Sequence, residues 1–527
     1  MEAFAELLDR LSHVGARNVK LRLIADYMRR TPDPDRGVAL AALAGELNLK
    51  TVKPALVREL AGARTDPELF RLSYDYVGDL AETVALIWPE ADVRPNAAPG
   101  LAETVERLEA AARKDAPALV ADLLDRLDAN GRWALLKLIT GGLRVGVSAR
   151  LARTALAELG APDTAEIEEV WHALAPPYGP LFDWIEGRAP KPDLSGAVVF
   201  RPLMLSHALD DAERPRLDPA DFRAEWKWDG IRVQLALRGG ERRLFSRTGD
   251  DISAAFPDLL ESLEGEGVLD GELLVMREGA LGRFNELQQR LNRKTVTKKL
   301  MADFPAGVRL YDILFDGAVD LRGLGFDDRR TRLEAWARAR PHPRLDLSPL
   351  VPFRDLDELE ARRMDPPHPA IEGVMLKRAD SPYRAGRPKG LWYKWKRDPM
   401  TVDCVLLYAQ RGHGKRSSLY SDFTFGAWRG GATGAELVPV GKAYFGFTDA
   451  ELAELDRFVR NHTVERYGPV RAVEAKLVLE IAFDGIHRSK RHKSGVAMRF
   501  PRIARIRWDK PAAEADRLET LEALIGE

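Results

Sequence analysis

The stretch E-W-K-W-D-G-I-R, residues 225–232, places a lysine directly before a tight turn and flanks it with charged side chains. Held at a strand end beside a phosphate-binding cleft, the amine of Lys227 can attack phosphorus and form a covalent phosphoramidate. The alternative is a plain β-hairpin, in which Asp229 and Gly230 form the turn between two paired strands. The residues that follow along the chain favour the nucleophilic lysine over the plain hairpin.

Five further clusters of charged or aromatic residues follow Lys227. They are S-R-T-G-D with Arg247, L-D-G-E-L with Glu272, Y-D-I-L-F-D with Tyr311, E-G-V-M-L-K-R with Glu372, and W-Y-K-W-K-R with Lys394 and Lys396. Each cluster alone has an ordinary explanation, such as a solvated acid or an exposed strand edge. Their succession within one region favours a single functional site.

The residue types in these clusters meet the needs of a lysine that attacks a phosphate. The nucleophile has to lose its proton, and neighbouring cations such as Lys394 and Lys396 favour the neutral amine. These two lysines are two residues apart, so a strand presents both on one face, where they can hold the phosphate. Glu272 and Glu372 can bind sugar hydroxyls or a divalent metal ion, and Tyr311 can stack on a purine.

Length and composition predict a globular protein of several domains. The 527 residues exceed the usual size of one domain, and 45% hydrophobic with 31% charged residues is not the composition of a disordered chain. No apolar run has the length of a membrane span, and the N-terminus does not resemble a secretory signal. Cys404 is the single cysteine, which excludes an internal disulfide. We therefore expect a cytoplasmic protein that does not bind membranes.

The first part of the chain, residues 1–190, carries apolar residues at helical spacing, as at Phe4 and Leu8. Asp163 and Glu166 have the spacing of a capping box, which begins a helix. The stretch 186–196 contains two prolines and is typical of a linker. These patterns predict an all-α N-terminal domain followed by a linker.

Beyond the linker, the apolar pattern changes from helical spacing to short β-branched and aromatic runs. The clearest of these runs are residues 233–237, 267–276 and 308–315. Because they alternate with helical stretches such as 284–291, residues 197–398 are predicted to form an α+β domain. A second boundary falls near residue 398, and residues 399–527 contain many short strands that predict a small β-barrel.

In their order along the chain, the clusters from K-W-D-G-I-R to W-Y-K-W-K resemble the motif series of the covalent nucleotidyltransferase superfamily. Residues 499–510, R-F-P-R-I-A-R-I-R-W-D-K, resemble the last motif of ATP-dependent DNA ligases, which an OB-fold carries. Residues 477–495 resemble the segment before it, and L-I-T-G-G-L-R-V-G-V-S, residues 138–148, resembles the N-terminal DNA-binding domain of that family. The resemblance covers nearly the whole chain and is closest to the bacterial three-domain form. It departs at Trp508, where an acidic residue is frequent.

The resemblance implies a multidomain fold. An all-α DNA-binding domain (residues 1–190) would precede an α+β nucleotidyltransferase domain of ATP-grasp-like type for adenylation (residues 197–398) and a β-barrel OB-fold domain (residues 399–527). It also implies sealing of 3′-hydroxyl/5′-phosphate nicks in duplex DNA through a lysyl-AMP and a DNA-adenylate. The implied cofactors are ATP and Mg²⁺, with Mn²⁺ as the alternative. A monomer would encircle nicked DNA at the nucleoid of a bacterial cytoplasm.

Carried over position by position, the resemblance implies a role for each residue of the motifs. Lys227 would be the adenylated nucleophile, Glu225 would lie at the adenine edge, and Tyr311 would stack on adenine. Arg232 would contact the ribose or the nick, Arg247 the 5′-phosphate of the nick, Glu272 the ribose and the metal, and Glu372 the metal. The phosphates would be held by Lys394 and Lys396 at the α-phosphate and by Arg507, Asp509 and Lys510 at the leaving pyrophosphate.

Three alternatives remain beside this interpretation. An RNA ligase or an RNA-capping guanylyltransferase also uses K-x-D-G, but neither explains residues 138–148. An NAD-dependent ligase is disfavoured because one cysteine cannot form that family's four-cysteine zinc module. A non-catalytic DNA-binding protein derived from a ligase belongs to a different functional class, and the intact Lys227, Glu272 and Glu372 speak against it.

Contacts with the DNA backbone have to come from local basic patches, because the net charge of the chain is −1. The candidates are Arg290, Arg293, Lys294, Lys298 and Lys299 in one stretch, and Arg488, Lys490, Arg491 and Lys493 in another. A solvated charged face is the alternative for each stretch. Gly141, Gly142 and Gly146 either let main-chain amides approach phosphates or form helix C-caps.

Overall fold

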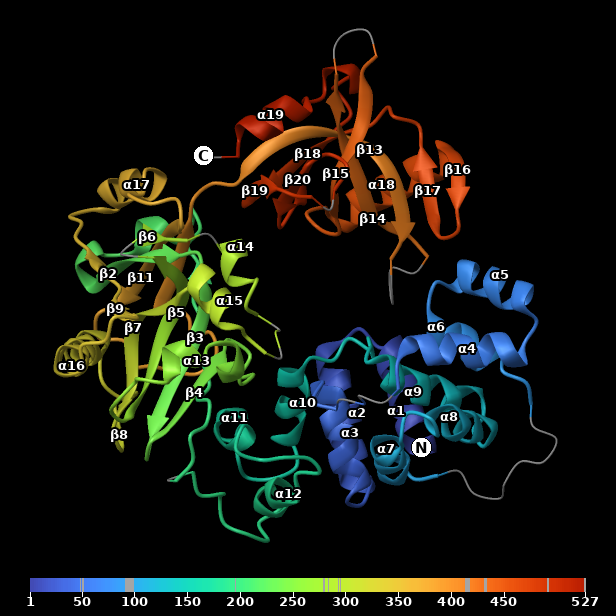
Figure 1. Ribbon diagram of the computed structural model, residues 1–527, viewed down its shortest axis with the longest axis horizontal. Coiled ribbons are helices and arrows are strands. Elements are labelled where there is room, and N and C mark those ends of the chain that lie inside the picture. Colours follow the sequence, from blue (N-terminus) through green and yellow to red (C-terminus); the bar gives the residue numbers. More distant parts are fainter. Residues whose placement is uncertain are drawn as a thin grey trace. The chain divides into compact units, whose positions relative to one another are not determined.

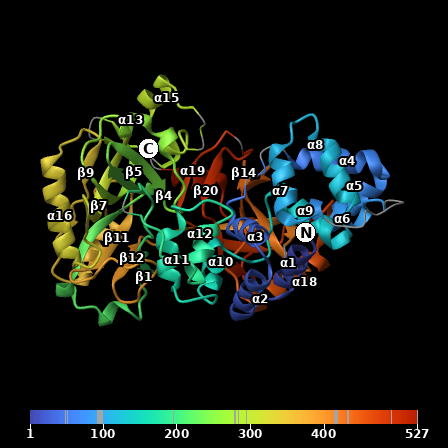
Figure 2. The same cartoon turned by 90° about the horizontal axis from the view of Figure 1, so that it is seen from below.

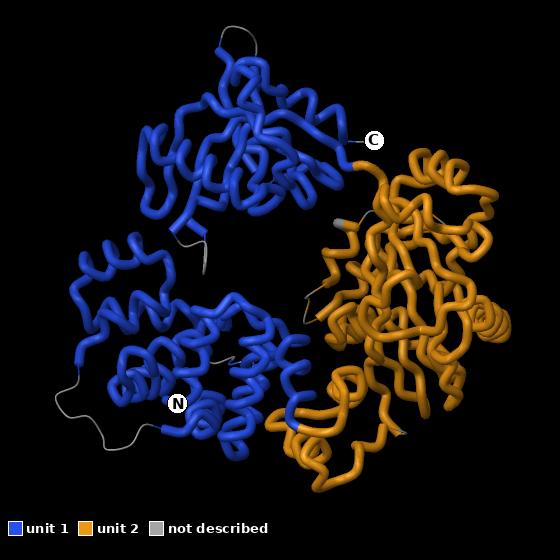
Figure 3. The backbone as a smooth tube through the Cα atoms, turned by 180° about the vertical axis from the view of Figure 1, so that it is seen from behind, with its two compact units in different colours: residues 1–159, 399–527 blue, residues 160–398 orange. Residues whose placement is uncertain are grey.

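The computed structural model describes residues 1–525 except residues 48, 50, 51, 91–98, 195, 278, 279, 283, 292, 294, 413–417, 431–433 and 491. The chain divides into two compact units, one formed by residues 160–398 and the other by residues 1–159 with residues 399–527 (Figure 3). None of the helices in the described part of the chain combines the length and the hydrophobicity that crossing a bilayer requires.

Residues 1–159 form helices in their described parts (Figure 1). These helices are α1 (Glu2–His13), α2 (Arg17–Arg30), α3 (Asp35–Ala44), α4 (Pro54–Arg64), α5 (Pro67–Val77), α6 (Leu80–Ile87), α7 (Leu101–Ala110), α8 (Ala116–Asp125), α9 (Ala129–Thr140) and α10 (Ala149–Leu156). The apolar residues predicted to line one face of the first helix, including Phe4 and Leu8, are buried. The helical periodicity of the sequence is therefore confirmed in this part.

Two of the three glycines proposed to approach phosphates instead end a helix. Gly141 has a φ of 71° after α9, and its N–H donates to the carbonyl of Leu138 while that of Gly142 donates to Lys137. Such paired bonds satisfy carbonyls that the end of a helix leaves free. The amides of Gly141 and Gly142 are thus used by α9, and the C-cap alternative is the correct one for both. Gly146 lies in the segment between α9 and α10 and does not cap a helix.

Residues 160–398 begin with α11 (Thr164–Trp171) and α12 (Gly179–Ile185), and Asp163 with Glu166 forms the predicted capping box. The strands of this unit form two sheets. The first sheet has the order β1 (His207–Ala208), β12 (Trp392–Lys396), β11 (Ile371–Arg378), β2 (Phe222–Trp228), β10 (Leu350–Val351). The second has the order β4 (Glu241–Ser246), β3 (Ile231–Arg238), β5 (Gly267–Arg277), β7 (Ala306–Asp316), β8 (Val319–Asp320), with β6 (Ala280–Leu281) paired to β5 and β9 (Leu345–Leu347) paired to β7.

The turn at Asp229 and Gly230 does not form a hairpin. Strand β2 pairs with β10 and β11, whereas β3 pairs with β4 and β5. The chain therefore passes from one sheet to the other at these two residues. This excludes the plain hairpin and places Lys227, near the end of β2, at the point where the two sheets meet.

Helices cover the outer faces of the sheets. They are α13 (Pro257–Leu260), α14 (Phe284–Leu287), α16 (Phe326–Ala339) and α17 (Leu356–Met364), whereas the short helix α15 (Lys298–Asp303) has no buried residue. Helix α16 packs along β7 and β9 (Figures 1 and 2), where Leu333 and Trp336 join the core formed by β3, β5 and β7. On the first sheet, Leu359 of α17 packs against β2, β11 and β12. The helical stretch predicted at 284–291 is shorter in the structure, because the chain turns after Leu287.

Residues 399–527 contain β13 (Met400–Arg411), β14 (Tyr420–Arg429), β15 (Glu436–Ala443), α18 (Asp449–Asn461), β16 (Thr463–Tyr467), β17 (Val470–Val473), β18 (Val478–Phe483), β19 (Gly485–Arg488), β20 (Val496–Arg499), β21 (Arg502–Arg507) and α19 (Leu518–Ala523). The long strand β13 pairs with β14, β17 and β18, and β18 pairs in turn with β21. Apolar residues of these strands and of α18 form one core. The predicted strands of this part are confirmed.

An ion pair between Asp312 on β7 and Arg329 on α16 is fully buried, with both side chains 0% exposed. Replacing Asp312 by alanine leaves the guanidinium buried without its carboxylate, so we expect a loss of about 3–5 kcal/mol in the free energy of unfolding. Urea unfolding of the full chain measures this loss. The double variant Asp312→Ala with Arg329→Leu should recover a substantial part of it. An equal loss in the single and double variants would contradict the role of the ion pair.

Candidate active site

Lys227 contacts a carboxylate from the neighbouring strand. Its Nζ donates to Oε2 of Glu372 on β11 at 2.6 Å, and Nζ of Lys396 on β12 lies 3.5 Å from the same oxygen. The register explains this arrangement, because Gly373 pairs with Lys227 on one side and with Lys396 on the other. One carboxylate is therefore shared by the predicted nucleophile and a predicted phosphate-binding lysine.

Gly373 allows these three strands to approach one another. Its φ is 149°, in a region that residues with a side chain rarely adopt. A Cβ placed on Gly373 would lie 2.2 Å from the carbonyl oxygen of Trp395 and 2.8 Å from Cα of Lys396. The backbone of β12 therefore excludes any side chain at this position of the E-G-V-M-L-K motif.

Gly230 has the same function where the chain passes between the two sheets. A Cβ on Gly230 would lie 2.5 Å from the carbonyl oxygen of Leu273 and 2.7 Å from Cγ of Glu272. The glycine of K-W-D-G thus lets the end of β2 approach β5. This close approach brings Lys227 of the first sheet near Glu272 of the second.

Burial raises the pKa of Glu272 to about 7. The charges of Lys227 and Arg232 oppose this rise, whereas those of Glu372 and Asp229 add to it. The site therefore holds two acids, Glu272 and Glu372, close enough to repel each other when both are ionised. A divalent cation bound between such carboxylates would remove that repulsion, and the donor set consists of the oxygen ligands that Mg²⁺ prefers.

Arg232 is held by two residues that we did not single out in the sequence. Its Nη2 donates to Oδ2 of Asp270 at 2.8 Å and to the hydroxyl of Tyr383 at 3.2 Å, and its Nη1 donates to the carbonyl of Met204. Asp270 is 0% exposed. It precedes Glu272 by two residues, so strand alternation could have identified it as a residue of the same face. The position of Tyr383 had no such signal.

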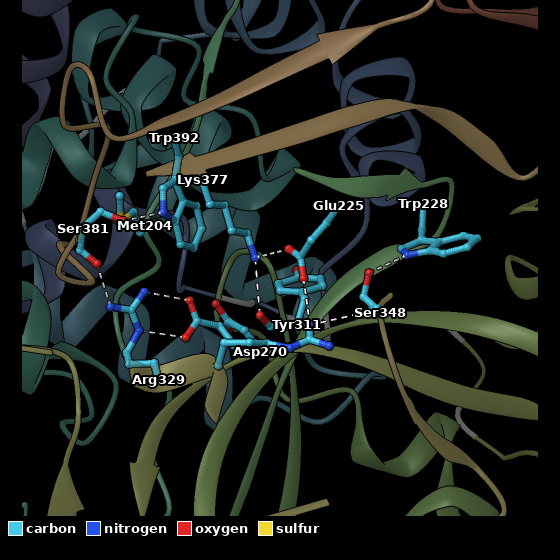
Figure 4. Close-up of polar contacts among 12 residues, drawn as sticks. Met204, Glu225, Trp228, Asp270, Tyr311, Arg329, Ser348, Lys377, Ser381 and Trp392 are labelled. Atoms are coloured by element: carbon cyan, nitrogen blue, oxygen red, sulfur yellow. Dashed lines mark hydrogen bonds and ion pairs between the residues drawn. The ribbon is translucent and has the colours of Figure 1, made fainter. Parts of the chain in front are cut away.

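Glu225, predicted at the adenine edge, is tied to cations through its side chain. Lys377 Nζ lies 2.5 Å from its Oε2, and Nη1 of Arg330 donates to its Oε1 at 3.1 Å (Figure 4). Both Glu225 and Lys377 are buried, and burial raises the pKa of the Glu225 carboxyl although Lys377 opposes this. The side chain of Glu225 is therefore engaged in ion pairs inside the protein.

The ammonium of Lys377 lies among three aromatic rings. Its Nζ is 4.6 Å from the ring centre of Tyr311 and 4.7 Å from that of Trp392 (Figure 4). The ring centre of Phe326 lies 4.8 Å from the same atom. These cation–π contacts hold the ring of Tyr311 in one orientation. Lys377 belongs to the E-G-V-M-L-K motif, but sequence reasoning selected only the glutamate of that motif.

Burial and the charges of the cations near the predicted phosphate site lower the pKa of Lys394. Burial lowers the pKa of Lys394, and the charges of Arg387, Lys227, Lys396 and Arg247 lower it further. Like charges destabilise one another in this way when no anion is present. The unit 160–398 therefore collects a group of cations at the predicted nucleophile, as binding of a polyphosphate requires.

Arg507 and Lys510 belong to the other unit. Arg507 ends β21 and Lys510 follows it, and both contact the carboxylate of Asp403. Asp509 accepts hydrogen bonds from Nε and Nη2 of Arg507. The three predicted residues of the last motif thus lie in one cluster around Asp403, a residue that the sequence did not suggest.

One of the predicted DNA-contacting residues has a structural role instead. Arg290 is 0% exposed and forms an ion pair with Asp258, with its guanidinium 4.7 Å from the ring centre of Phe256. It cannot contact DNA from this position. Lys294 and Arg491 lie outside the described residues. The other predicted cations are exposed, namely Arg293, Lys298, Lys299, Arg488, Lys490 and Lys493.

A basic pocket lies in the helical part between α1, α2 and the segment before α10. Arg17, Lys20, Arg144 and Arg150 line it together with Gly146. Lys20 is buried, and its Nζ donates to the carbonyl of Gly146 at 3.1 Å. Part of the L-I-T-G-G-L-R-V-G-V-S segment thus forms a cationic surface, as a phosphate-binding segment requires.

We expect Gly373→Ala to lower the free energy of unfolding by about 2–4 kcal/mol, because the added Cβ overlaps the backbone of β12. Gly390→Ala is the matched control, since Gly390 has a φ of 77° and a Cβ at this position would have no neighbour within 4 Å. Its loss should be only about 1 kcal/mol. Urea unfolding compares the two variants, and equal losses would mean that the contact with β12 is unimportant.

Glu272→Gln should stabilise the protein at pH 8, because the glutamine removes a carboxylate whose pKa is raised to about 7. The destabilisation by ionised Glu272 is fully present above that value and disappears as the pH falls towards the ordinary value of 4.5. The expected gain is about 1–3 kcal/mol at pH 8 and shrinks as the pH falls below ~7. Thermal unfolding at pH 5.5 and 8 measures it, and a gain independent of pH would contradict this assignment.

Two parts of the chain match known protein families. Residues 203–396 match the family "ATP dependent DNA ligase domain", and residues 416–510 match "ATP dependent DNA ligase C terminal region". The first of these ranges includes every site residue described above in the unit 160–398.

Similar proteins extend over nearly the whole chain. A "Probable DNA ligase" of Koribacter versatilis is 31% identical over 99% of this chain and 96% of its own length. "DNA ligase 1" of Korarchaeum cryptofilum is 30% identical over 99% of this chain and 98% of its own length. The solved structure named "Pmar-Lig_PreS3" has a TM-score of 0.60 at 16% identity, covering 96% of this chain and 99% of that one, and so supports the fold. The chain belongs to the ATP-dependent DNA ligase family.

Proposed function

We propose that Lys227 is the residue that carries AMP during nick sealing. Its Nζ attacks the α-phosphorus of ATP, so that an N–P bond forms and the bond to the leaving pyrophosphate breaks. AMP then passes to the 5′-phosphate of the nick, and the 3′-hydroxyl displaces it. The observation that carries this proposal is the contact of Lys227 with Glu372, a carboxylate that Lys396 also contacts, close enough to Lys394 for the charges to affect one another.

Glu372 has a second role in this proposal. At 2.6 Å, its carboxylate accepts a hydrogen bond from Nζ of Lys227, the atom that has to attack the α-phosphorus. A divalent cation that binds Glu372 would weaken this contact and free the amine. We propose that Glu272 and Glu372 hold Mg²⁺, or Mn²⁺, together with oxygens of the substrate. When bound, the ion would draw negative charge from the phosphate.

The remaining residues of the site would hold the nucleotide and the nick. Tyr311 stacks on adenine, with its ring held by Lys377, and Glu225 contacts the adenine edge through its backbone. Arg232 contacts the ribose or the nick from its position on Asp270. Lys394 and Lys396 hold the α-phosphate, and Arg247, which is exposed, holds the 5′-phosphate of the nick.

The proposed enzyme has three domains that act in turn. Residues 1–190 would bind DNA, supported by the basic pocket around Gly146, and residues 197–398 would carry the adenylated lysine. Residues 399–527 would form an OB-fold that brings Arg507, Asp509 and Lys510 to the pyrophosphate and then moves away to admit DNA. A monomer would encircle nicked DNA at the nucleoid, and the exposed basic stretches would contact its backbone without reading sequence.

Incubation with α-labelled ATP and magnesium should transfer label to the protein, and Lys227→Ala should abolish this transfer because the variant lacks the nucleophile. Parallel incubations with labelled GTP and NAD should leave the protein unlabelled. Subsequent addition of nicked duplex DNA should remove the label as the nick closes. Gel electrophoresis of the denatured protein and of the DNA measures both steps.

Lys476→Ala is the matched control, since Lys476 is an exposed lysine paired with Glu474. It should label and seal like the unchanged protein. Label from GTP would instead indicate an RNA-capping nucleotidyltransferase, and discharge only at nicks in RNA would indicate an RNA ligase. Labelling that persists in Lys227→Ala would show that another residue carries the nucleotide.

A further inference from the structure

Two cations of the last motif, Arg507 and Lys510, contact the same carboxylate oxygen. Nζ of Lys510 donates to Oδ2 of Asp403 at 2.8 Å, and Nη1 of Arg507 donates to the same atom at 3.2 Å. Asp403 lies on β13, more than a hundred residues before its partners. None of the motifs in the sequence includes it, and the fold alone brings it to the last motif.

The carboxylate of Asp403 has a fixed position. Its side chain is only 12% exposed. Its own N–H donates to Oδ2 of Asp516 at 2.7 Å, and the N–H of Asp516 donates back to the Asp403 carbonyl at 2.8 Å. On its other side, Asp403 is the cross-strand partner of Glu480 on β18. The backbone at Asp403 is therefore held from both sides, so its carboxylate can act as an anchor.

Arg507 and Lys510 need such an anchor. Two like charges three residues apart repel each other and would separate if each were free to choose its rotamer. A shared oxygen offsets the repulsion and brings both head groups within hydrogen-bond distance of one atom. Asp403 accordingly raises the pKa of Lys510. The ammonium and the guanidinium retain further N–H donors, which can bind an anion while the contacts with Asp403 persist.

We propose that Asp403 is a positioning residue that holds Arg507 and Lys510 side by side for the pyrophosphate of ATP. Neighbouring anionic oxygens of a polyphosphate match a pair of cations already held together, and such preorganisation avoids the cost of ordering them during the reaction. This inference rests on the proposed role of Arg507 and Lys510 in the first step. Asp403 itself contacts neither reacting atom.

A competing role for the same carboxylate predicts the opposite effect. Asp403 binds both cations and Asp509 binds Arg507, so in this second role the two carboxylates are competitors that the triphosphate has to displace. In that case removal of the Asp403 charge would increase the rate of adenylation at low ATP concentration. If Asp403 orients the cations, the same change decreases that rate. The direction of the effect therefore discriminates between the two roles.

The test compares two steps of the reaction in the full-length chain with Asp403→Asn. We expect the rate of Lys227 adenylation from ATP to fall about 10- to 100-fold, mainly in the rate constant at saturating ATP, because misplaced cations stabilise the leaving group poorly. Sealing of a nick that already carries AMP should remain within about 3-fold of the unchanged protein, since pyrophosphate plays no part in it. Single-turnover measurements with labelled ATP and with pre-adenylated DNA give the two rates.

Asp403→Glu keeps the charge but displaces the anchor by one methylene group. It should also slow adenylation while sealing is retained, and it serves as the test if the asparagine variant does not fold. Asp456→Asn is the matched control, because Asp456 is a buried aspartate of the same part whose carboxylate pairs with Arg460. We expect its two rates to stay in the proportion seen in the unchanged protein.

The variant Lys510→Ala tests the proposed function of the last motif independently of the role of Asp403. If Lys510→Ala leaves adenylation unchanged, the assigned role of the last motif is wrong. If Lys510→Ala slows adenylation but Asp403→Asn speeds it, or slows both steps equally, the positioning role of Asp403 is wrong. Combining Asp403→Asn with Lys510→Ala should slow adenylation by less than the product of the two single effects, because part of the effect of Asp403 acts through Lys510 and the rest through Arg507.

Discussion

The close approach of the backbone at Gly230 is the constraint on which the candidate site depends. The chain leaves the first sheet at this residue and enters the second, and no side chain fits between it and β5. Two sheets that meet in this way bring a lysine from one and a carboxylate from the other into one place. Lys227 and Glu272 are neighbours for this reason, although they lie far apart in the sequence. Gly373 repeats the arrangement between β11 and β12, where it lets Lys396 approach Glu372.

Carboxylates shared between cations recur throughout the site. Glu372 contacts both Lys227 and Lys396, and Glu225 lies between Lys377 and an arginine of α16. Each such acid reduces the repulsion between cations that a phosphate substrate would otherwise have to offset. A protein that collects positive charge for a polyphosphate is thus kept folded when no polyphosphate is bound. This explains why buried acids accompany the cations of the site.

The sequence was a good guide wherever local rules decide the outcome. Strand alternation correctly placed Lys394 and Lys396 on one strand, and the spacing of Asp163 and Glu166 correctly predicted a capping box. It failed where a side chain's role depends on what packs against it. Arg290 belongs to a basic stretch and yet is buried against Asp258, because α13 lies beside it. Charge alone does not reveal whether an arginine faces solvent or the core.

By itself, the sequence determined the order of the motifs, the identity of the nucleophile candidate Lys227 and the change from helical to strand periodicity. These depend on residues close together in the chain, whose spacing has a direct meaning in a helix or a strand. Only the tertiary structure decided that Asp229 and Gly230 connect two sheets and that Asp403 holds the last motif. Both depend on contacts between strands that are distant in sequence. The apolar pattern of one strand does not predict which distant strand will pair with it.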